Sequence, residues 1–245
     1  MSKTVILIPS RLSASRLPGK PLLKINGISI ISHVVKKAKE ADIGDVYVAT
    51  EDQEIIDDVN LNGGKAILTS NNHKTGSDRI FECFEKLNLK NIEYIINLQG
   101  DEPNIDLNDL RHLNKLINLK KPVVGTMCSK IDNRSILKDE NIVKVITDNK
   151  ITDKNFPIAL DFKRKVNDHI TNIYHHIGIY AFKPEILKKI VNLKQTKNEI
   201  KNRLEQLRAI ENKIKINVAL AKFSSIGIDT MDDYLALKKL LEYKY

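Results

Sequence analysis

The first half of the chain alternates short apolar runs with helical patterns, and this alternation constrains the fold more than any other feature. Four runs rich in β-branched residues are predicted strands: TVILI (4–8), DVYVAT (45–50), AILTS (66–70) and YIINLQ (94–99). Between them, apolar residues recur at helical spacing, most clearly in ISIISHVVKKAKEA (28–41). Strands separated by helices indicate a parallel sheet covered on both faces. We therefore expect an α/β protein with a mostly parallel sheet flanked by helices.

The texture of the sequence changes after about residue 122. Three more runs are predicted strands: VVGTMC (123–128), NIVKVITD (141–148) and IYHHIGIYAF (173–182). The polar stretch between the last two contains Pro157, and we expect it to be a loop. The sequence thus predicts a less regular region in the second half.

The segment EIKNRLEQLRAIE (199–211) has the spacing of one amphipathic helix. Ile200, Leu204, Leu207 and Ile210 would share its apolar face. A strand (215–223) and a closing helix are predicted to follow. We expect one domain over residues 1–245, with a smaller mixed lobe inserted at roughly 149–212.

Composition bounds the class of protein. The 245 residues are 42% hydrophobic and 29% charged, so the chain can bury a sizeable core. Its 40 basic and 31 acidic residues give a net charge of +9, which favours anionic partners. The lysines are nevertheless spread along the whole chain, so a generally lysine-rich sequence also explains the charge. A nucleic-acid-binding protein would need clustered cations and exposed aromatic residues, but aromatic content is 5% with no tryptophan. We expect no nucleic-acid partner.

Cysteine content and hydropathy indicate the compartment. Cys83 and Cys128 are the only cysteines and have no CxxC spacing, which is typical of a protein from a reducing compartment. No apolar run approaches the roughly 18–20 residues that a membrane span needs, and no signal-peptide pattern precedes the first strand. We expect a cytoplasmic protein without a membrane partner.

A basic segment, PSRLSASRLPGKP (9–21), follows the first predicted strand. It packs Arg11, Arg16 and Lys20 around Gly19 with no acidic residue to compensate their repulsion. The end of a strand that runs into a turn and a helix exposes backbone N–H groups, which favour negative charge. Arginine and lysine suit the oxygens of a triphosphate, and Lys20 is our candidate for the cation nearest the reacting phosphorus. A solvated surface turn with three unrelated charges is the alternative.

Acidic residues follow two other predicted strands. NLQGDEP (97–103) places Asp101 and Glu102 after a strand that should lie centrally, at the edge where α/β sheets bind ligands. GIDT (227–230) places Asp229 at a second such end. Asp101 and Asp229 could together hold Mg²⁺, which binds one or two carboxylates and substrate phosphates. The alternative is that these residues shape turns, with Thr230 capping the closing helix.

HHIGIY (175–180) places histidine and tyrosine side chains on a strand. Adjacent histidines point to opposite faces, so at most one serves a given site. A single histidine on a strand is more often a packing residue than a catalyst. The sequence has no Ser/His/Asp order or histidine-rich metal spacing, and no known phosphate-loop or dinucleotide-binding glycine motif follows its strands.

Together, five motifs resemble those of the 3-deoxy-manno-octulosonate (Kdo) cytidylyltransferases, also called CMP-Kdo synthetases. They are IPSRLSASRLPGKPL, NLQGDEP, HHIGIYAF, RLEQLR and GIDT, in the order and approximate spacing of that family. The loop NHKTGSDRI (72–80) is also similar to a loop of the family. The resemblance implies a Rossmann-like nucleotidyltransferase fold, a homodimer, and Mg²⁺-dependent transfer of CMP from CTP to Kdo on the path to lipopolysaccharide.

The resemblance also implies roles for individual residues. The catalytic residues would be Lys20, Asp101 and Arg16. Residues in contact with the nucleotide would be Arg11, Arg16, Lys20, Ser77 and Gln99. The magnesium ligands would be Asp101 and Asp229. The sugar pocket would be lined by His176, Tyr180, Glu205 and Gln206. In this mechanism the anomeric hydroxyl attacks the α-phosphorus in line, and pyrophosphate leaves beneath the basic segment.

The chain departs from the family pattern on the sugar side. Its segment 149–165 lacks the Ser-Arg pair of the family, and Asn202 stands where a glutamate is usual. Lys163, Arg164 or Lys165 is a candidate partner for the sugar carboxylate. An amino-substituted Kdo or another acidic 2-keto sugar therefore stays open as the acceptor. A catalytically inactive nucleotide sensor is a further alternative, against which Lys20, Asp101 and Asp229 argue.

Overall fold

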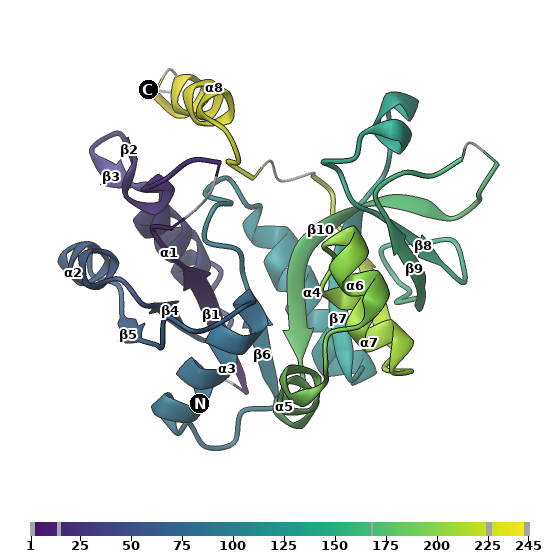
Figure 1. Ribbon diagram of the computed structural model, residues 1–245, viewed down its shortest axis with the longest axis horizontal. Coiled ribbons are helices and arrows are strands. Elements are labelled where there is room, and N and C mark those ends of the chain that lie inside the picture. The colour runs from purple at the N-terminus through teal and green to yellow at the C-terminus, as the bar shows by residue number, and fades with distance from the viewer. Residues whose placement is uncertain (1–2, 14–15, 168, 224–226, 243–245) are drawn as a thin grey trace. The chain divides into compact units, whose positions relative to one another are not determined.

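The computed structural model describes residues 3–13, 16–167, 169–223 and 227–242. By its internal contacts the chain forms two compact units. The first unit comprises residues 1–107 and 225–245, and the second comprises residues 108–224. The strands and helices of each unit are described separately below (Figure 1).

The first unit contains a parallel sheet. Its strands are β1 (Thr4–Ser10), β4 (Asp45–Thr50), β5 (Ala66–Leu68) and β6 (Tyr94–Asn97). They lie in the order β5-β4-β1-β6, and each pair is parallel. This is the order in which Rossmann-like sheets arrange their first four strands. Strands β1 and β6 are buried on both faces, which explains their unbroken apolar sequences. The predicted parallel sheet is confirmed.

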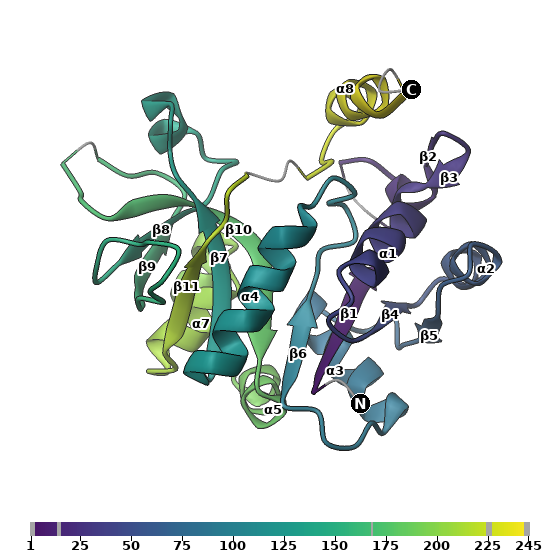
Figure 2. The same ribbon diagram turned by 180° about the vertical axis from the view of Figure 1, so that it is seen from behind.

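Three helices connect these strands and cover the sheet. They are α1 (Ile30–Glu40), α2 (Gln53–Leu61) and α3 (Gly76–Leu87). Helix α1 connects β1 to β4, toward one edge of the sheet, and α3 connects β5 to β6, toward the other edge. Because such connections are right-handed, α1 and α3 lie on opposite faces of the sheet (Figures 1 and 2). Helix α1 begins two residues later than predicted, because Ile28 and Ser29 form strand β3 instead. Ser29 then caps the helix by accepting a hydrogen bond from the Ser32 N–H group.

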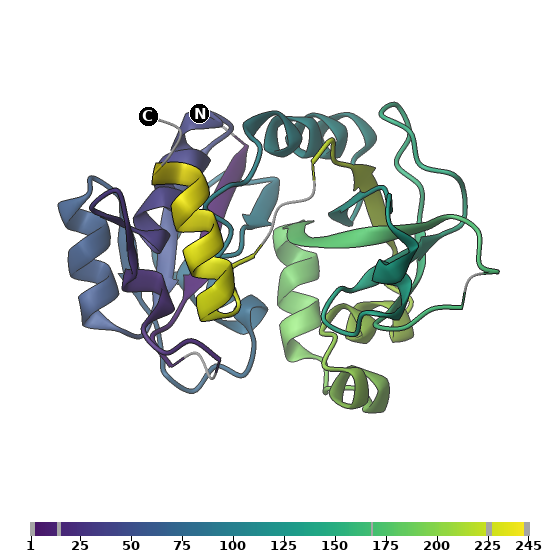
Figure 3. The same cartoon turned by 90° about the horizontal axis from the view of Figure 1, so that it is seen from above.

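The C-terminal helix α8 (Met231–Glu242) packs against a small hairpin of the same unit (Figure 3). The hairpin pairs β2 (Lys24–Ile25) with β3 (Ile28–Ser29) after a short 3₁₀ turn, η1 (Lys20–Leu22). The hydroxyl of Tyr234 donates to the Lys24 carbonyl at 2.7 Å. A shared apolar cluster contains Leu17, Ile25, Ile30, Ile228, Tyr234 and Leu237. This cluster fixes the basic segment and the GIDT motif to one support.

The second unit has a mixed sheet. Its strands are β7 (Val124–Ser129), β8 (Lys144–Thr147), β9 (Ala159–Lys163), β10 (Ile173–Phe182) and β11 (Ile216–Leu220). Strand β11 is parallel to β7, whereas β7–β10, β10–β8 and β8–β9 are antiparallel. The prediction of a loop between β8 and β10, around Pro157, was wrong, because this stretch contains strand β9. That strand has only two buried residues, Ala159 and Phe162, so its sequence shows little alternation.

Helices cover the mixed sheet. They are α4 (Leu107–Lys120), α5 (Pro184–Asn192), α6 (Lys197–Asn202) and α7 (Gln206–Glu211), with a 3₁₀ segment η2 (Arg134–Lys138). Helix α4 runs along the sheet (Figure 2), and a Cβ at Gly125 of β7 would meet Ile117 of α4 at 3.1 Å. This close approach requires the glycine.

The single helix predicted over residues 199–211 was wrong. Arg203 has a φ of 52°, in the left-handed region, and separates α6 from α7. Ile200 is 60% exposed, so it does not share a buried face with Leu204 and Leu207. A polar interaction decides the geometry instead, because Glu199 of α6 and Arg208 of α7 form a buried ion pair.

Within the part of the chain that the structure describes, no helix is long and apolar enough to cross a membrane. Cys83 and Cys128 are both buried and free. Burial raises the pKa of the Cys83 thiol to about 12 and that of the Cys128 thiol further, so both are protonated at neutral pH.

Candidate active site

Hydrogen bonds hold the described residues of the basic segment, 9–13 and 16–21, at the end of β1. The Gly19 N–H group donates to the Leu12 carbonyl at 3.0 Å, and the Leu12 N–H group donates to Asp52 at 2.7 Å. Gly19 has a φ of 71°, which a residue with a side chain rarely adopts, and it leads directly into η1. Leu17 and Pro21 are buried at the base of the turn. These contacts therefore fix the backbone at Leu12 and at Gly19, the residue before Lys20.

Lys20 lies at the centre of the site. Its ammonium Nζ is 2.6 Å from Asp101 Oδ2, 2.5 Å from the Ile228 carbonyl oxygen and 3.8 Å from Asp229 Oδ1. The Lys20 side chain is only 12% exposed, whereas those of Asp101 and Asp229 are 30% and 45% exposed. Two carboxylates that are 128 residues apart in sequence thus meet at one cation.

The Gln99-Gly100-Asp101 turn carries the first carboxylate. It follows β6, whose neighbour in the sheet is β1. A Cβ at Gly100 would lie 3.0 Å from the Pro9 carbonyl oxygen, so only glycine lets this turn pass so close to the end of β1. The backbone N–H of Ile228 donates to the Asp101 carbonyl at 3.0 Å. This bond joins the two acidic motifs directly.

The second carboxylate, Asp229, lies at the entry to α8. Thr230 caps the helix by accepting from the Asp233 N–H group at 3.2 Å, as the sequence suggested. Asp233 in turn accepts from the N–H groups of Asp229 and Thr230. Burial alone would raise the pKa of Asp233, but the hydrogen bonds from Thr230 and the Asp229 N–H group lower it. Asp229 Oδ1 also pairs with Arg16 Nη2 at 2.9 Å.

A cavity of about 320 Å³ opens among these residues. All three cations of the basic segment line it, together with Gln99, Asp101 and Asp229. The structure therefore brings together the predicted nucleotide and metal residues, with one exception. Ser77 is buried in the first turn of α3, where it adjoins the lining residue Gly76.

The cavity also has polar lining residues that we did not predict from the sequence. Ser10, His73, Lys74 and Arg79 line it. The Ser10 side chain is buried, and its hydroxyl has no hydrogen-bond partner among the described residues, so it can bind a ligand atom. Ser10 lies inside the basic segment 9–21, so the sequence offered it as a further candidate for binding the nucleotide. His73 and Lys74 lie in NHKTGSDRI, where only the resemblance gave a signal.

The donor atoms around Lys20 are suited to a magnesium ion. The carboxylates of Asp101 and Asp229 and the Ile228 carbonyl present hard oxygen atoms to one positively charged centre. No described group of three or more His, Cys, Asp or Glu side chains forms a complete metal cage. Two carboxylates alone suit Mg²⁺, because this ion usually takes its remaining ligands from water and substrate phosphates.

The predicted sugar residues lie in the second unit, on β10 and α7. His176 is buried, its Nε2 is 3.0 Å from the Thr126 hydroxyl, and its ring packs edge-on against Phe162. Because the Thr126 hydroxyl donates to the Ile179 carbonyl, it accepts from His176. Burial lowers the pKa of His176 to about 3, so the ring is neutral. This geometry matches the packing role that the sequence left open beside the functional one.

Tyr180 and Glu205 lie within electrostatic reach of each other. A bulge in the pairing of β10 with β7, between Ile177 and Tyr180, places the tyrosine ring 5.4 Å from the ring of His176. Burial, together with the charge of Glu205, raises the pKa of Tyr180 well above its ordinary value. Gln206 begins helix α7. Three of the four predicted sugar residues thus form one neighbourhood.

The cations proposed to replace the missing sugar-side residues have other partners. Arg164 donates to the carbonyl groups of Asn202, Arg203 and Glu140. Lys163 pairs with Asp161 at 3.2 Å, and Lys165 pairs with Glu140. Arg164 thereby fastens the break between α6 and α7, which is a structural role.

Comparisons with known proteins show which family the chain belongs to. A cytidylyltransferase family model matches residues 5–216. The 3-deoxy-manno-octulosonate cytidylyltransferase of Thermodesulfovibrio yellowstonii is 39% identical over 97% of this chain and 98% of its own. That of Afipia carboxidovorans is 38% identical over 97% and 96%. The chain belongs to the 3-deoxy-manno-octulosonate cytidylyltransferase family.

Solved structures of other proteins share the fold of this chain. A CMP:2-keto-3-deoxy-manno-octonic acid synthetase complexed with CTP superposes over all of both chains with a TM-score of 0.90 and 33% identity. A UDP-glucose pyrophosphorylase, at 17% identity and a TM-score of 0.72, shares the fold. The expected α/β nucleotidyltransferase fold is confirmed. The roles of individual residues in this cytidylyltransferase remain predictions.

Proposed function

We propose that this cytidylyltransferase moves CMP from CTP to the anomeric hydroxyl of Kdo. The observation that carries the proposal is the meeting of Asp101 and Asp229 at the Lys20 ammonium, beneath the two arginines of the basic segment. A polyanion and a divalent cation together would satisfy this arrangement of charges. The relatives of T. yellowstonii and A. carboxidovorans bear the name of this activity.

The proposed reaction forms one bond and breaks one. The sugar oxygen bonds to the α-phosphorus of CTP, and the bond from that phosphorus to the bridging oxygen of pyrophosphate breaks. The hydroxyl proton leaves to solvent or to Asp101. Arg11 and Arg16 bind the departing phosphates, and Lys20 offsets the charge that develops on them. Nucleotidyl transfer needs positioning and charge stabilisation more than covalent chemistry, and this site supplies both.

Asp101 and Asp229 would hold magnesium in the loaded enzyme. The ion would supply charge neutralisation at the phosphate oxygens. Lys20 would then have to share its two carboxylate partners with the ion, so its ammonium would be free to turn toward the phosphates. The nucleotide residues proposed around it are Gln99, which lines the cavity, and Ser77, which supports its wall.

The acceptor is assigned to Kdo, with His176, Tyr180, Glu205 and Gln206 proposed to recognise it. An amino-substituted Kdo is the second candidate, because Asn202 replaces a glutamate of the family pattern. In this structure Asn202 donates to the Asn198 carbonyl and leaves no carboxylate at its position. We further propose a homodimer that works in the cytoplasm, where CTP is made.

A pyrophosphate-release assay tests the function. Purified protein with Mg²⁺ is offered CTP, UTP or ATP in combination with Kdo, its 8-amino analogue or sialic acid. We expect release with CTP and Kdo only. Release with the amino sugar but not with Kdo would reassign the acceptor, and release with UTP or ATP would reassign the nucleotide. No release with any pair would leave the chain a nucleotide sensor. Sedimentation of the same sample tests the dimer.

A further inference from the structure

The segment from Ser70 to Gly76 forms one wall of the nucleotide cavity, and it has no regular secondary structure before α3 begins. His73, Lys74, Thr75 and Gly76 all line the cavity. A wall made from a loop can bind a ligand tightly only if other groups fix the loop beforehand.

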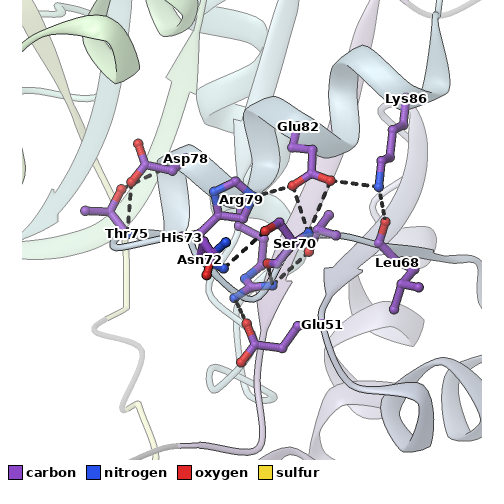
Figure 4. Close-up of polar contacts among 11 residues, drawn as sticks. Glu51, Leu68, Ser70, Asn72, His73, Thr75, Asp78, Arg79, Glu82 and Lys86 are labelled. Carbon is purple, nitrogen blue, oxygen red and sulfur yellow. Dashed lines mark hydrogen bonds and ion pairs between the residues drawn. The ribbon is translucent and has the colours of Figure 1, made fainter.

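Three side chains from the first two turns of α3 hold this segment: those of Asp78, Arg79 and Glu82 (Figure 4). Asp78 accepts from the Thr75 N–H group, and Thr75 accepts from the Asp78 N–H group, which forms a capping box. Arg79 donates to the Thr69 hydroxyl at 2.7 Å and to the Ser70 carbonyl at 3.2 Å, and it pairs with Glu51. These contacts fix the two ends of the loop.

Glu82 fixes the middle of the loop. Its carboxylate accepts from the Ser70 N–H group at 2.9 Å and from the ring nitrogen Nε2 of His73, and it pairs with Lys86 at 2.7 Å (Figure 4). Burial alone would raise the pKa of Glu82, but the hydrogen bonds from Lys86, Ser70 and His73 lower it to about 2. The carboxylate is thus ionised and can only accept, so Nε2 of His73 carries the hydrogen.

We propose that Glu82 is a positioning residue for nucleotide binding, which holds Ser70 and His73 so that the loop 70–76 stays against the cavity. The proposal rests on the proposed function, because the bound nucleotide is taken to be CTP. Glu82 itself does not line the cavity. It acts through the lining residue His73 and through the backbone at Ser70, two residues after the end of β5.

The decisive variant is Glu82→Gln, which keeps the size of the side chain but loses its charge. An amide presents only one accepting oxygen, so it cannot accept from Ser70, His73 and Lys86 together. We expect the KM for CTP to rise about tenfold, with kcat changed less than about threefold, because binding loses preorganisation while the reacting groups stay in place. Glu85→Gln is the matched control, since Glu85 is exposed on the same helix. It should leave both constants unchanged.

Two further measurements separate this role from a general loss of structure. Amide hydrogen exchange in the free protein should accelerate in residues 70–75 of Glu82→Gln and not elsewhere. His73→Ala should raise the KM for CTP as well, and His73→Gln, which keeps a donor near the Nε2 position, should restore part of the loss. In the double variant Glu82→Gln/His73→Ala, the rise in the KM for CTP should be smaller than the product of the two single-variant increases, because both variants remove the same contact.

The possible failures are distinguishable. If the unaltered protein releases no pyrophosphate with CTP, the proposed function fails, and hydrogen exchange still tests the positioning role. If the unaltered protein is active but Glu82→Gln has a normal KM and normal exchange in 70–75, the positioning role is overturned. If Glu82→Gln does not fold, His73→Ala decides, and a normal KM in that variant also overturns the proposal.

Discussion

The two units differ in the burial and in the partners of their main charged groups. In the first unit, Lys20, Asp101 and Asp229 come together from a 3₁₀ turn, the turn after β6 and the entry to α8, beside a cavity, and the two carboxylates are partly exposed. In the second unit, Glu199 and Arg208 are each less than 5% exposed and bind each other in a bidentate pair. The first arrangement leaves charge available to a ligand, whereas the second uses it to hold two helices together.

Lys144 makes the same contrast with Lys20. Its side chain is fully buried, and its ammonium donates to the carbonyl groups of Asp139, Ile142 and Arg164. Burial lowers the pKa of Lys144. Each of the two lysines binds three oxygen atoms, but only Lys20 binds carboxylates that a metal could also bind. The partners of a buried cation therefore indicate its role better than its burial does.

The largest effect should follow from Asp101→Asn in the first unit. Loss of this charge would lower Mg²⁺-dependent turnover about 10³-fold, because both the metal and Lys20 lose a partner. Pyrophosphate release over a magnesium titration measures it. Chelation should abolish the activity of the unaltered protein, and added Mg²⁺ should restore it. Turnover within about threefold of normal in the variant would remove Asp101 from the site.

Glu199→Gln should have the largest effect in the second unit, but on stability. It leaves Arg208 buried without a charged partner and should lower the free energy of unfolding by about 3 kcal/mol. Urea unfolding followed by circular dichroism measures it. Arg16→Gln is the comparison from the first unit. Since Arg16 and Asp229 are largely exposed, its effect on unfolding should stay below about 0.5 kcal/mol. Equal effects would break the contrast between the units.

Lys20→Ala should sharpen the assignment of the first unit. If the ammonium acts chiefly on charge that develops during transfer, kcat should fall about 10²-fold while the KM for CTP changes much less. Steady-state kinetics with varied CTP measures both constants. Lys24→Ala serves as a control, because Lys24 is exposed on the neighbouring hairpin. A change confined to the KM would make Lys20 a binding residue only.

The most gradual effect, which is spread over several pH units, concerns acid stability and His176 of the second unit. Its folded pKa of about 3 lies below the ordinary value of 6.5, so between these values the unfolded chain binds a proton that the folded chain does not. Stability should therefore fall as the pH drops through this window, by up to about 1.4 kcal/mol per pH unit. His176→Gln should make the dependence shallower between pH 6 and 4. The exposed His169→Gln should not.

Much of the first unit could be predicted because the local signals for strands and for helices indicate the same fold. Strand β4 has the predicted bounds, and so does the long strand β10 of the second unit, since runs of β-branched and aromatic residues begin and end there. Asp101 could be placed at the ligand-binding edge because the strand ends of an α/β sheet meet there. The strand end predicted for Asp229 was wrong, since β11 ends at Leu220 and Asp229 lies at the entry to α8. The bond from the Ile228 N–H group to the Asp101 carbonyl, rather than a strand, brings the second carboxylate to the site.

The remaining features depend on contacts between distant residues. The apolar spacing of 199–211 continues across Arg203, and only the buried pair of Glu199 with Arg208 and the left-handed backbone at Arg203 reveal the break. Glu82 looks like an ordinary surface residue of an amphipathic helix. Its partner Ser70 is twelve positions away, and the contact exists only because the loop folds back on α3.

The bond from Ile228 to the Asp101 carbonyl has a consequence for how the protein is made. The two carboxylates that meet at Lys20 come from positions 101 and 229. A ribosome must therefore translate past position 229 before any chain can assemble the complete charge cluster. Shorter products, from premature termination or proteolysis, would contain the whole basic turn but lack the second acid. Such fragments should be unable to consume nucleotide while they await degradation.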